Sequence, residues 1–170
     1  PLFIKPANSG SSIGISKVVN QSDIMRALQK AWSIDHRIIV EEGLEVRELE
    51  VGIVGKENLI ASEVGEVNYK SDWYDFESKY KTNNKITIPA NINTKLREEI
   101  KTLSIQSCKA LNISIFARVD FFLEKDTNKI YLNEINTIPG FTENSMFPLL
   151  WKASGLEINE LVARLIEYTL

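Results

Sequence analysis

Histidine and cysteine are almost absent from this 170-residue sequence, which contains one residue of each, His36 and Cys108. One cysteine cannot form a disulfide within the chain, and this pair cannot build a multi-ligand zinc site or a redox pair. A Ser-His-Asp triad would have to use His36, which we expect in an exposed connection between a helix and an apolar run. Any chemistry must therefore use carboxylates, lysines, arginines, hydroxyls, backbone amides or an oxygen-bound metal.

The sequence also lacks long apolar runs and an excess of positive charge. No stretch approaches the roughly 18 apolar residues of a membrane-spanning helix, and no basic start precedes an apolar segment. We therefore expect no membrane partner and no signal peptide. Lysine and arginine number 20 and aspartate and glutamate 23, a net charge of −3, which argues against nucleic-acid binding. With 44% apolar and 25% charged residues, the composition is that of a folded globular protein.

Hydrophobic periodicity predicts a mixed α+β fold. Apolar runs predict strands at residues 2–5, 13–19, 37–41, 46–54, 58–66, 85–89, 115–123 and 129–135. Helical spacing predicts helices at residues 23–32, 94–111, 148–154 and 159–168. Residues 65–84 are polar and aperiodic, as in functional or disordered loops. Trp32 and Cys108 lie on apolar helix faces, so we assign both side chains to the core.

The last predicted hairpin gathers four polar side chains. Because side chains alternate along a strand, Arg118 and Asp120 share one face of the first strand. Glu134 and Asn136 share one face of the second strand in the same way. A turn centred near Thr127 would place Asp120 opposite Glu134, and Arg118 opposite Asn136. Facing carboxylates repel, so a cation should lie between them.

Oxygen ligands of this kind suit a hard cation such as Mg²⁺, whose shell is usually completed by phosphate oxygens. For a hairpin taken by itself, a salt bridge on a solvated sheet face is the commoner explanation. Both interpretations stay open at this level.

Two further segments carry groups suited to phosphate. The first is Lys5-Pro-Ala-Asn-Ser-Gly-Ser-Ser-Ile-Gly14, in which glycines allow backbone N–H groups to face an anion and Lys5 adds a charge. It is not a Walker loop, because Gly-Lys-Ser/Thr and a following helix are missing. The second is Glu-Ser-Lys79-Tyr80, whose polar groups could close over an anion. Each segment alone is more often a plain turn or a solvated loop.

The ordered set of motifs resembles one family, the D-alanine–D-alanine ligases of the ATP-grasp superfamily. The motifs are Lys5-Pro, Gly10-Ser-Ser-Ile-Gly14, Glu-Ser-Lys79-Tyr80, Ala-Arg118-Val-Asp120 and Asn133-Glu134-Ile-Asn136-Thr-Ile-Pro-Gly140-Phe-Thr. They extend over essentially the whole chain. The resemblance implies an α+β ATP-grasp fold, with residues 1–41 as the remainder of the central lobe and residues 42–170 as the C-terminal lobe. The family's N-terminal domain has no counterpart, so we expect the C-terminal part of a ligase.

The resemblance implies a reaction in which ATP activates one D-alanine as an acyl phosphate and a second D-alanine displaces phosphate, for peptidoglycan precursors. It implies ATP and Mg²⁺, or Mn²⁺, as cofactors, D-alanine as substrate, a cytoplasmic location and a homodimer in the intact enzyme. A D-alanine–D-serine ligase, a D-alanine–D-lactate ligase and an inert nucleotide-binding fragment remain alternatives.

The resemblance also implies roles for individual residues. The implied magnesium ligands are Asp120, Glu134 and Asn136. The implied ATP contacts are Lys5, Ser11, Glu41, Glu42, Glu48, Lys79 and Phe122. The implied catalytic residues are Arg118, which stabilises an oxyanion, and Ser11, Lys79 and Tyr80. The implied contacts to the second D-amino acid are Arg118, Gly140, Ser145 and Met146.

Four positions bear on the contact with ATP or on the choice of the second substrate. Glu42 stands where many relatives have lysine, which leaves that one contact to ATP open. Met146 stands where D-serine ligases tend to have arginine, so it favours D-alanine, as does Tyr80. Glu143 adds a negative charge to the same loop, which weakens the preference for D-alanine.

Overall fold

The computed structural model describes residues 1–10, 12–68 and 85–170, which divide into two compact units. One unit includes residues 1–45, and the other includes residues 46–68 and 85–170. The domain boundary predicted from the sequence, between residues 41 and 42, lies inside a strand and four residues before this division.

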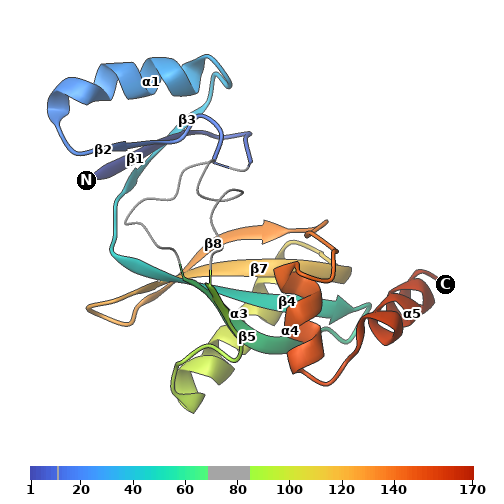
Figure 1. Cartoon of the computed structure of the whole chain (residues 1–170). Helices are drawn as coiled ribbons and strands as arrows, with labels where there is room; N and C mark the ends of the chain where they lie inside the picture. The colour runs from blue at the N-terminus through green and yellow to red at the C-terminus, as the bar shows by residue number, and fades with distance from the viewer. Residues whose placement is uncertain (11, 69–84) are drawn as a thin grey trace. The chain divides into compact units, whose positions relative to one another are not determined.

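The first unit is a three-stranded antiparallel sheet that packs against one helix (Figure 1). Its strands are β1 (Leu2–Pro6), β2 (Ser16–Val18) and β3 (Ile38–Glu42), in the order β2-β1-β3. A 3-10 turn, η1 (Gln21–Asp23), leads into α1 (Ile24–Trp32). The strand β2 is shorter than the predicted residues 13–19, because Ser12 and Gly14 have φ angles of 60° and 80° in a preceding turn.

The core of this unit is formed by Ile4, Val18, Ala27 and Ala31. The core assignment of Trp32 is wrong, because its side chain is 56% exposed and lies edge-on to His36, 5.0 Å between ring centroids. Helix α1 carries apolar side chains beyond the face that meets the sheet, so periodicity alone could not exclude Trp32 from the core.

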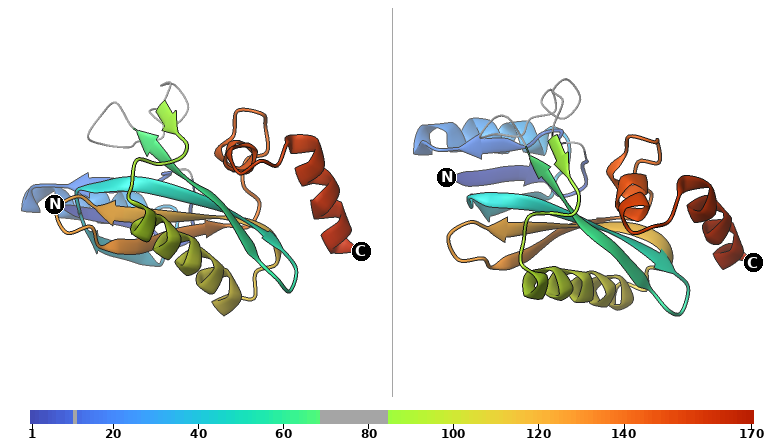
Figure 2. Two further views of the ribbon diagram at one scale, coloured as in Figure 1. Left: turned by 90° about the horizontal axis from the view of Figure 1, so that it is seen from below. Right: turned by 60° about the horizontal axis from the view of Figure 1, so that its bottom comes forward.

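The second unit is a five-stranded antiparallel sheet with helices on both faces (Figure 2). Its strands are β4 (Val46–Gly55), β5 (Ile60–Asn68), β6 (Lys85–Thr87), β7 (Ile115–Glu124) and β8 (Ile130–Asn136), in the order β6-β5-β4-β7-β8. Its helices are α3 (Thr94–Ala110), α4 (Met146–Ala153) and α5 (Ile158–Thr169). The predicted α+β class is confirmed, with helix and strand ends shifted by a few residues.

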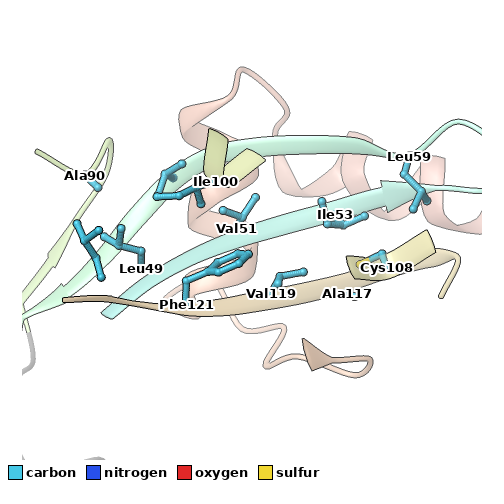
Figure 3. Close-up of a cluster of buried hydrophobic side chains, with 12 residues drawn as sticks. Leu49, Val51, Ile53, Leu59, Ala90, Ile100, Cys108, Ala117, Val119 and Phe121 are labelled. Carbon is cyan, nitrogen blue, oxygen red and sulfur yellow. The ribbon is translucent and has the colours of Figure 1, made fainter. Parts of the chain in front are cut away.

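One face of this sheet packs against α3. Val51 of β4 and Phe121 of β7 belong, with Ile100 and Cys108 of the helix, to one cluster of twelve buried side chains (Figure 3). Since side chains alternate across a strand, Val51 on this face leaves Glu50 and Gly52 on the opposite face of β4.

Helix α4 packs on that opposite face over two glycines. A Cβ atom at Gly52 would lie 2.7 Å from Nε1 of Trp151, and one at Gly65 would lie 2.8 Å from Cδ2 of Leu150. Only glycine allows the helix to approach the strands this closely. The same sheet face carries the polar side chains of the candidate site.

The buried position of Cys108 predicts an unreactive thiol. Its side chain is fully buried, and burial raises its pKa from 9.0 to about 11. At pH 8 the thiolate fraction falls about 100-fold relative to a free thiol. We expect no labelling by a thiol reagent such as dithionitrobenzoate until the chain unfolds in urea. Rapid labelling of the folded chain would contradict the burial of this residue.

None of the helices in the described ranges is long and apolar enough to cross a membrane.

Candidate functional site

The strands β7 and β8 form the hairpin predicted from the sequence, and the predicted register is confirmed. Asp120 pairs with Glu134, and Arg118 pairs with Asn136. All four side chains therefore lie on the sheet face opposite α3.

A β-bulge, absent from the sequence-based prediction, produces this register. Next to the Asp120–Glu134 pair, Phe121 pairs with Leu132, so Asn133 is an extra residue in β8. Without the bulge, Asn133 would stand opposite Asp120, and Glu134 would pair with Val119 on the core face. The bulge therefore brings the second carboxylate to the polar face.

Arg118 lies at the centre of the polar group. Its Nε and Nη2 atoms donate hydrogen bonds to the two oxygens of Asp120, each over 2.7 Å. Its Nε atom also lies 2.9 Å from Oε2 of Glu50. The three side chains are largely buried, with 17%, 12% and 11% of the Arg118, Asp120 and Glu50 side chains exposed.

Glu50 is a site residue that the sequence analysis did not identify. On the central strand β4 it pairs with Asp120, which in turn pairs with Glu134, so three carboxylates form a row across three strands. The alternation around Gly52 could place Glu50 on a face, but it could not reveal that β4 pairs with β7. Glu50 could therefore be identified as a site residue only from the pairing of β4 with β7, which are far apart in the sequence.

The electrostatics of this row keep Arg118 charged. Burial by itself lowers the pKa of the Arg118 guanidinium. Its hydrogen bonds to Asp120 and the negative charges of Glu50, Asp120 and Glu134 outweigh that effect and raise the pKa above its ordinary value. The cation that we expected beside the facing carboxylates is thus supplied, at least in part, by Arg118.

Asn136 joins the two carboxylates of the hairpin. Its amide nitrogen donates to Oδ2 of Asp120 over 2.9 Å and to Oε1 of Glu134 over 3.3 Å. Rotation of this amide would present its oxygen instead. Two carboxylates and one amide oxygen fit Mg²⁺, which needs few protein ligands when phosphate completes its shell. Within the described ranges there is no group of three His, Cys, Asp or Glu that could hold a metal.

Glu48 and Phe122, two of the implied ATP contacts, lie together. They are cross-strand partners on β4 and β7, on the same face as Arg118, and both are half-buried.

The loop before α4 holds the residues implied to bind the second amino acid. Oγ of Ser145 accepts a hydrogen bond from the Thr142 amide over 3.1 Å and lies 2.8 Å from Oγ1 of Thr142. Gly140 lies beside the same hydroxyl, since a Cβ atom there would be 3.1 Å from it. Met146 is buried, and its sulfur packs against Gly65 of β5. Ser145 is thus half-buried and hydrogen-bonded within the loop, whereas Met146 packs into the interior.

In the first unit, Lys5 and Glu41 form an ion pair of 2.7 Å. They lie on adjacent strands, where Phe3 is the partner of Glu41 and Ile39 is the partner of Lys5. Glu42 is the next residue along β3, so its side chain points to the other face of the sheet. Ser11, Lys79 and Tyr80 lie outside the described residues.

Comparison with known proteins identifies the family to which the chain belongs. The family model described as D-ala D-ala ligase C-terminus matches residues 1–167. The chain belongs to the D-alanine–D-alanine ligase family. It is similar to the D-alanine–D-alanine ligases of two Prochlorococcus marinus strains, with 68% identity for MIT 9301 and 67% for AS9601, in each case over 170 residues.

Solved structures of ligases match the fold. The VanG D-Ala:D-Ser ligase from Enterococcus faecalis matches 100% of this chain with a TM-score of 0.90 and 36% identity, over 50% of its own chain. The D-alanine–D-alanine ligase from Coxiella burnetii matches 98% of this chain with a TM-score of 0.85 and 33% identity, over 44% of its own chain. The ATP-grasp fold implied by the motifs is confirmed.

This ligase-family chain spans about half the length of the curated relatives it matches, 48% for the MIT 9301 protein. It corresponds to their C-terminal part, as the motifs led us to expect.

Proposed function

We propose that the protein carrying this chain is an ATP-dependent ligase that joins two D-alanines through an acyl phosphate, for peptidoglycan precursor synthesis. The observation that carries the proposal is the pairing of Asp120 with Glu134 and of Arg118 with Asn136 on one face of the hairpin. The family membership of residues 1–167 supports it.

The chemistry of this reaction matches the residues of the site. Negative charge develops on phosphoryl oxygens during activation and on a tetrahedral oxyanion when the amine attacks. Arg118 holds a permanent positive charge that stabilises such an oxyanion, as fixed donors do in acyl-transfer sites. Asp120, Glu134 and Asn136 would hold Mg²⁺, which when bound neutralises charge on the phosphates. Neither step requires histidine or cysteine.

The proposed ATP contacts are supported by observations made in each compact unit by itself. The ion pair between Lys5 and Glu41 supports a nucleotide role for the first unit, in which Ser11 and Glu42 also belong to the proposal. The cross-strand pair of Glu48 and Phe122 supports adenosine contacts in the second unit. Lys79 and Tyr80 complete the proposed catalytic set. We also carry forward the lobe assignment of residues 1–41 and 42–170.

For the second substrate we propose D-alanine. The buried, apolar Met146 follows Ser145, so the loop presents a hydroxyl without a neighbouring positive charge. D-serine is the second candidate, because a D-Ala:D-Ser ligase matches the whole chain at 36% identity. Competition between D-alanine, D-serine and D-lactate in one assay, with the products separated by mass, distinguishes these possibilities.

The proposed use of ATP for a cell-wall precursor favours a cytoplasmic location. A homodimer stays a prediction, for which the oligomeric state in solution is the direct measurement.

The activity can be measured in an exchange protein, in which this chain replaces the 170 matched residues of the MIT 9301 relative. We expect phosphate release that requires both Mg²⁺ and D-alanine, with one dipeptide formed per phosphate. Phosphate release without dipeptide would overturn the proposal. Calorimetry of the 170-residue chain with Mg²⁺ and ATP tests the alternative of an inert fragment, which predicts binding without turnover.

Replacing Asp120 by asparagine tests the metal ligands. Loss of outer-shell partners of a metal site costs about 10- to 100-fold in affinity, so loss of a direct ligand should exceed that range. We expect Mg²⁺-dependent ATP binding to weaken accordingly, whereas binding of ATP without Mg²⁺ changes little. Asp126→Asn, in the exposed turn of the same hairpin, is the matched control and should leave both affinities unchanged. Equal Mg²⁺ dependence in the Asp120 variant and wild type would exclude Asp120 as a ligand.

A further inference from the structure

Glu50 is a buried acid that the proposed reaction does not use. It lies on the central strand of the sheet, is 8% exposed, and faces the same side as the hairpin residues. Its Oε2 atom lies 2.9 Å from Nε of Arg118, close enough for a direct ion pair. Burying a carboxylate in a row with two further carboxylates costs free energy unless a cation pairs with it.

Arg118 Nε has a single hydrogen and two carboxylate oxygens beside it. That hydrogen is directed to Oδ1 of Asp120 over 2.7 Å. The contact with Glu50 at 2.9 Å is therefore one of charge, in a position from which Glu50 could accept the same hydrogen. Asp120 lies on β7, the same strand as Arg118, and Glu50 lies directly opposite Asp120 on the neighbouring strand β4.

Asp120 already accepts most of the hydrogen bonds that a carboxylate can accept. It takes two hydrogen bonds from Arg118 and one from Asn136, out of about four lone-pair sites. If Asp120 also binds a cation, it must give up at least one of these hydrogen bonds. If Arg118 were held by Asp120 alone, it would lose its position whenever Asp120 engaged another partner.

We propose that Glu50 is a positioning residue that holds the Arg118 guanidinium independently of Asp120. When Asp120 releases the Nε hydrogen, Glu50 accepts it, so the Arg118 guanidinium keeps its place beside the hairpin carboxylates. The role of this arrangement in turnover rests on the proposed function, whereas the alternative hydrogen bond itself is a property of the chain.

The same sheet offers a matched control on its other face. Glu66 is 7% exposed and accepts two hydrogen bonds of 2.7 Å from Arg47, so it is also a buried acid paired with arginine. It is the partner of Leu49 and lies on the side that faces α3, away from Arg118. Substitution of Glu66 therefore measures the cost of losing a buried ion pair without touching the site.

Nuclear magnetic resonance of the full 170-residue chain tests the hydrogen bond without any ligand. The Arg118 Nε–H signal is assigned by its loss in Arg118→Lys, and its exchange with water is compared between wild type and Asp120→Ala. We expect the signal to stay protected in Asp120→Ala, because Glu50 takes the hydrogen. Exchange as fast as in a solvent-exposed arginine would overturn the proposal.

Kinetics of the exchange protein test the consequence for catalysis. We expect Glu50→Leu to lower kcat about 10- to 100-fold, as for supporting partners of catalytic groups, with KM for ATP nearly unchanged. Glu50→Gln, which keeps an acceptor oxygen, should recover part of the loss. In an Arg118→Lys background, Glu50→Leu should lower kcat no further. Glu66→Gln should lower the melting temperature and leave kcat unchanged.

The outcomes separate the two proposals. An equal loss of kcat in both Arg118 backgrounds, or a loss in Glu66→Gln as large as in Glu50→Leu, would overturn the positioning role and leave the ligase function standing. An inactive exchange protein whose Arg118 Nε–H stays protected in Asp120→Ala would overturn the proposed function and support the alternative hydrogen bond.

Discussion

Replacing Arg118 by methionine is expected to lower the free energy of unfolding by about 3–5 kcal/mol, because it removes one partner of a buried ion pair. Glu50 and Asp120 are nine-tenths buried and adjacent across the ladder, so the variant leaves two like charges facing each other. Methionine retains most of the apolar stem, so the loss reports the missing charge rather than a cavity.

The stability loss is measured by urea unfolding of the 170-residue chain at pH 7. Arg26→Met is the matched control, because the Arg26 side chain is 84% exposed and its pair with Asp23 contributes less than about 1 kcal/mol. The folded-state pKa of Arg118 is raised above its ordinary value, so its contribution to stability is complete at every pH below that ordinary value. The difference between variant and wild type should therefore not fall as pH rises from 7 to 10. If the Arg118→Met variant is as stable as wild type, this ion pair does not stabilise the fold and the prediction is wrong.

The same variant should also remove most turnover in the exchange protein. Loss of one donor to an oxyanion costs about 100- to 1,000-fold in kcat. Arg118→Lys keeps the charge but lacks the planar fork that reaches both oxygens of Asp120, so we expect an intermediate rate. A normal kcat in Arg118→Met would exclude a direct role for this residue in the reaction.

Replacing Phe147 by alanine is the second large change, with an expected loss of about 3–5 kcal/mol of unfolding free energy from lost burial and the remaining cavity. Phe147 is fully buried and meets the rings of Phe116, Phe141 and Trp151 at centroid distances of 5.9, 5.8 and 6.5 Å. Its neighbours come from strand β7, from the loop before α4 and from α4 itself. The ring therefore joins the candidate substrate loop to the sheet.

Because Ser145 begins the turn of α4 that carries Phe147, loosening this helix should affect the second amino acid more than the nucleotide. In the exchange protein we expect KM for the second D-alanine to rise, with Mg²⁺-dependent ATP binding retained at temperatures where the variant is folded. Val162→Ala, at a half-exposed position of α5, is the control and should change stability little. Equal effects on ATP and D-alanine would show that the cluster supports the whole unit rather than the loop.

Much of the fold could be predicted because local patterns and tertiary packing agree. The alternation of side chains along β7 predicted that Arg118 and Asp120 share one face and stand opposite Asn136 and Glu134, and the structure confirms it. Helix α3 was predicted from its spacing, and Cys108 lies in its core as assigned. Where a segment is apolar beyond one face, as in α1, the pattern could not decide, and Trp32 was misplaced.

The amino-acid sequence by itself determined the chemistry available to this protein. With one histidine and one cysteine, a site must be built from carboxylates, amides, hydroxyls and arginine, and the order of the motifs indicated the ligase family. The tertiary structure alone decided how those groups meet. The bulge at Asn133 turns Glu134 toward Asp120, and the pairing of β4 with β7 brings Glu50 to Arg118. Both depend on contacts between strands, whose register arises from packing of the whole sheet rather than from any local pattern.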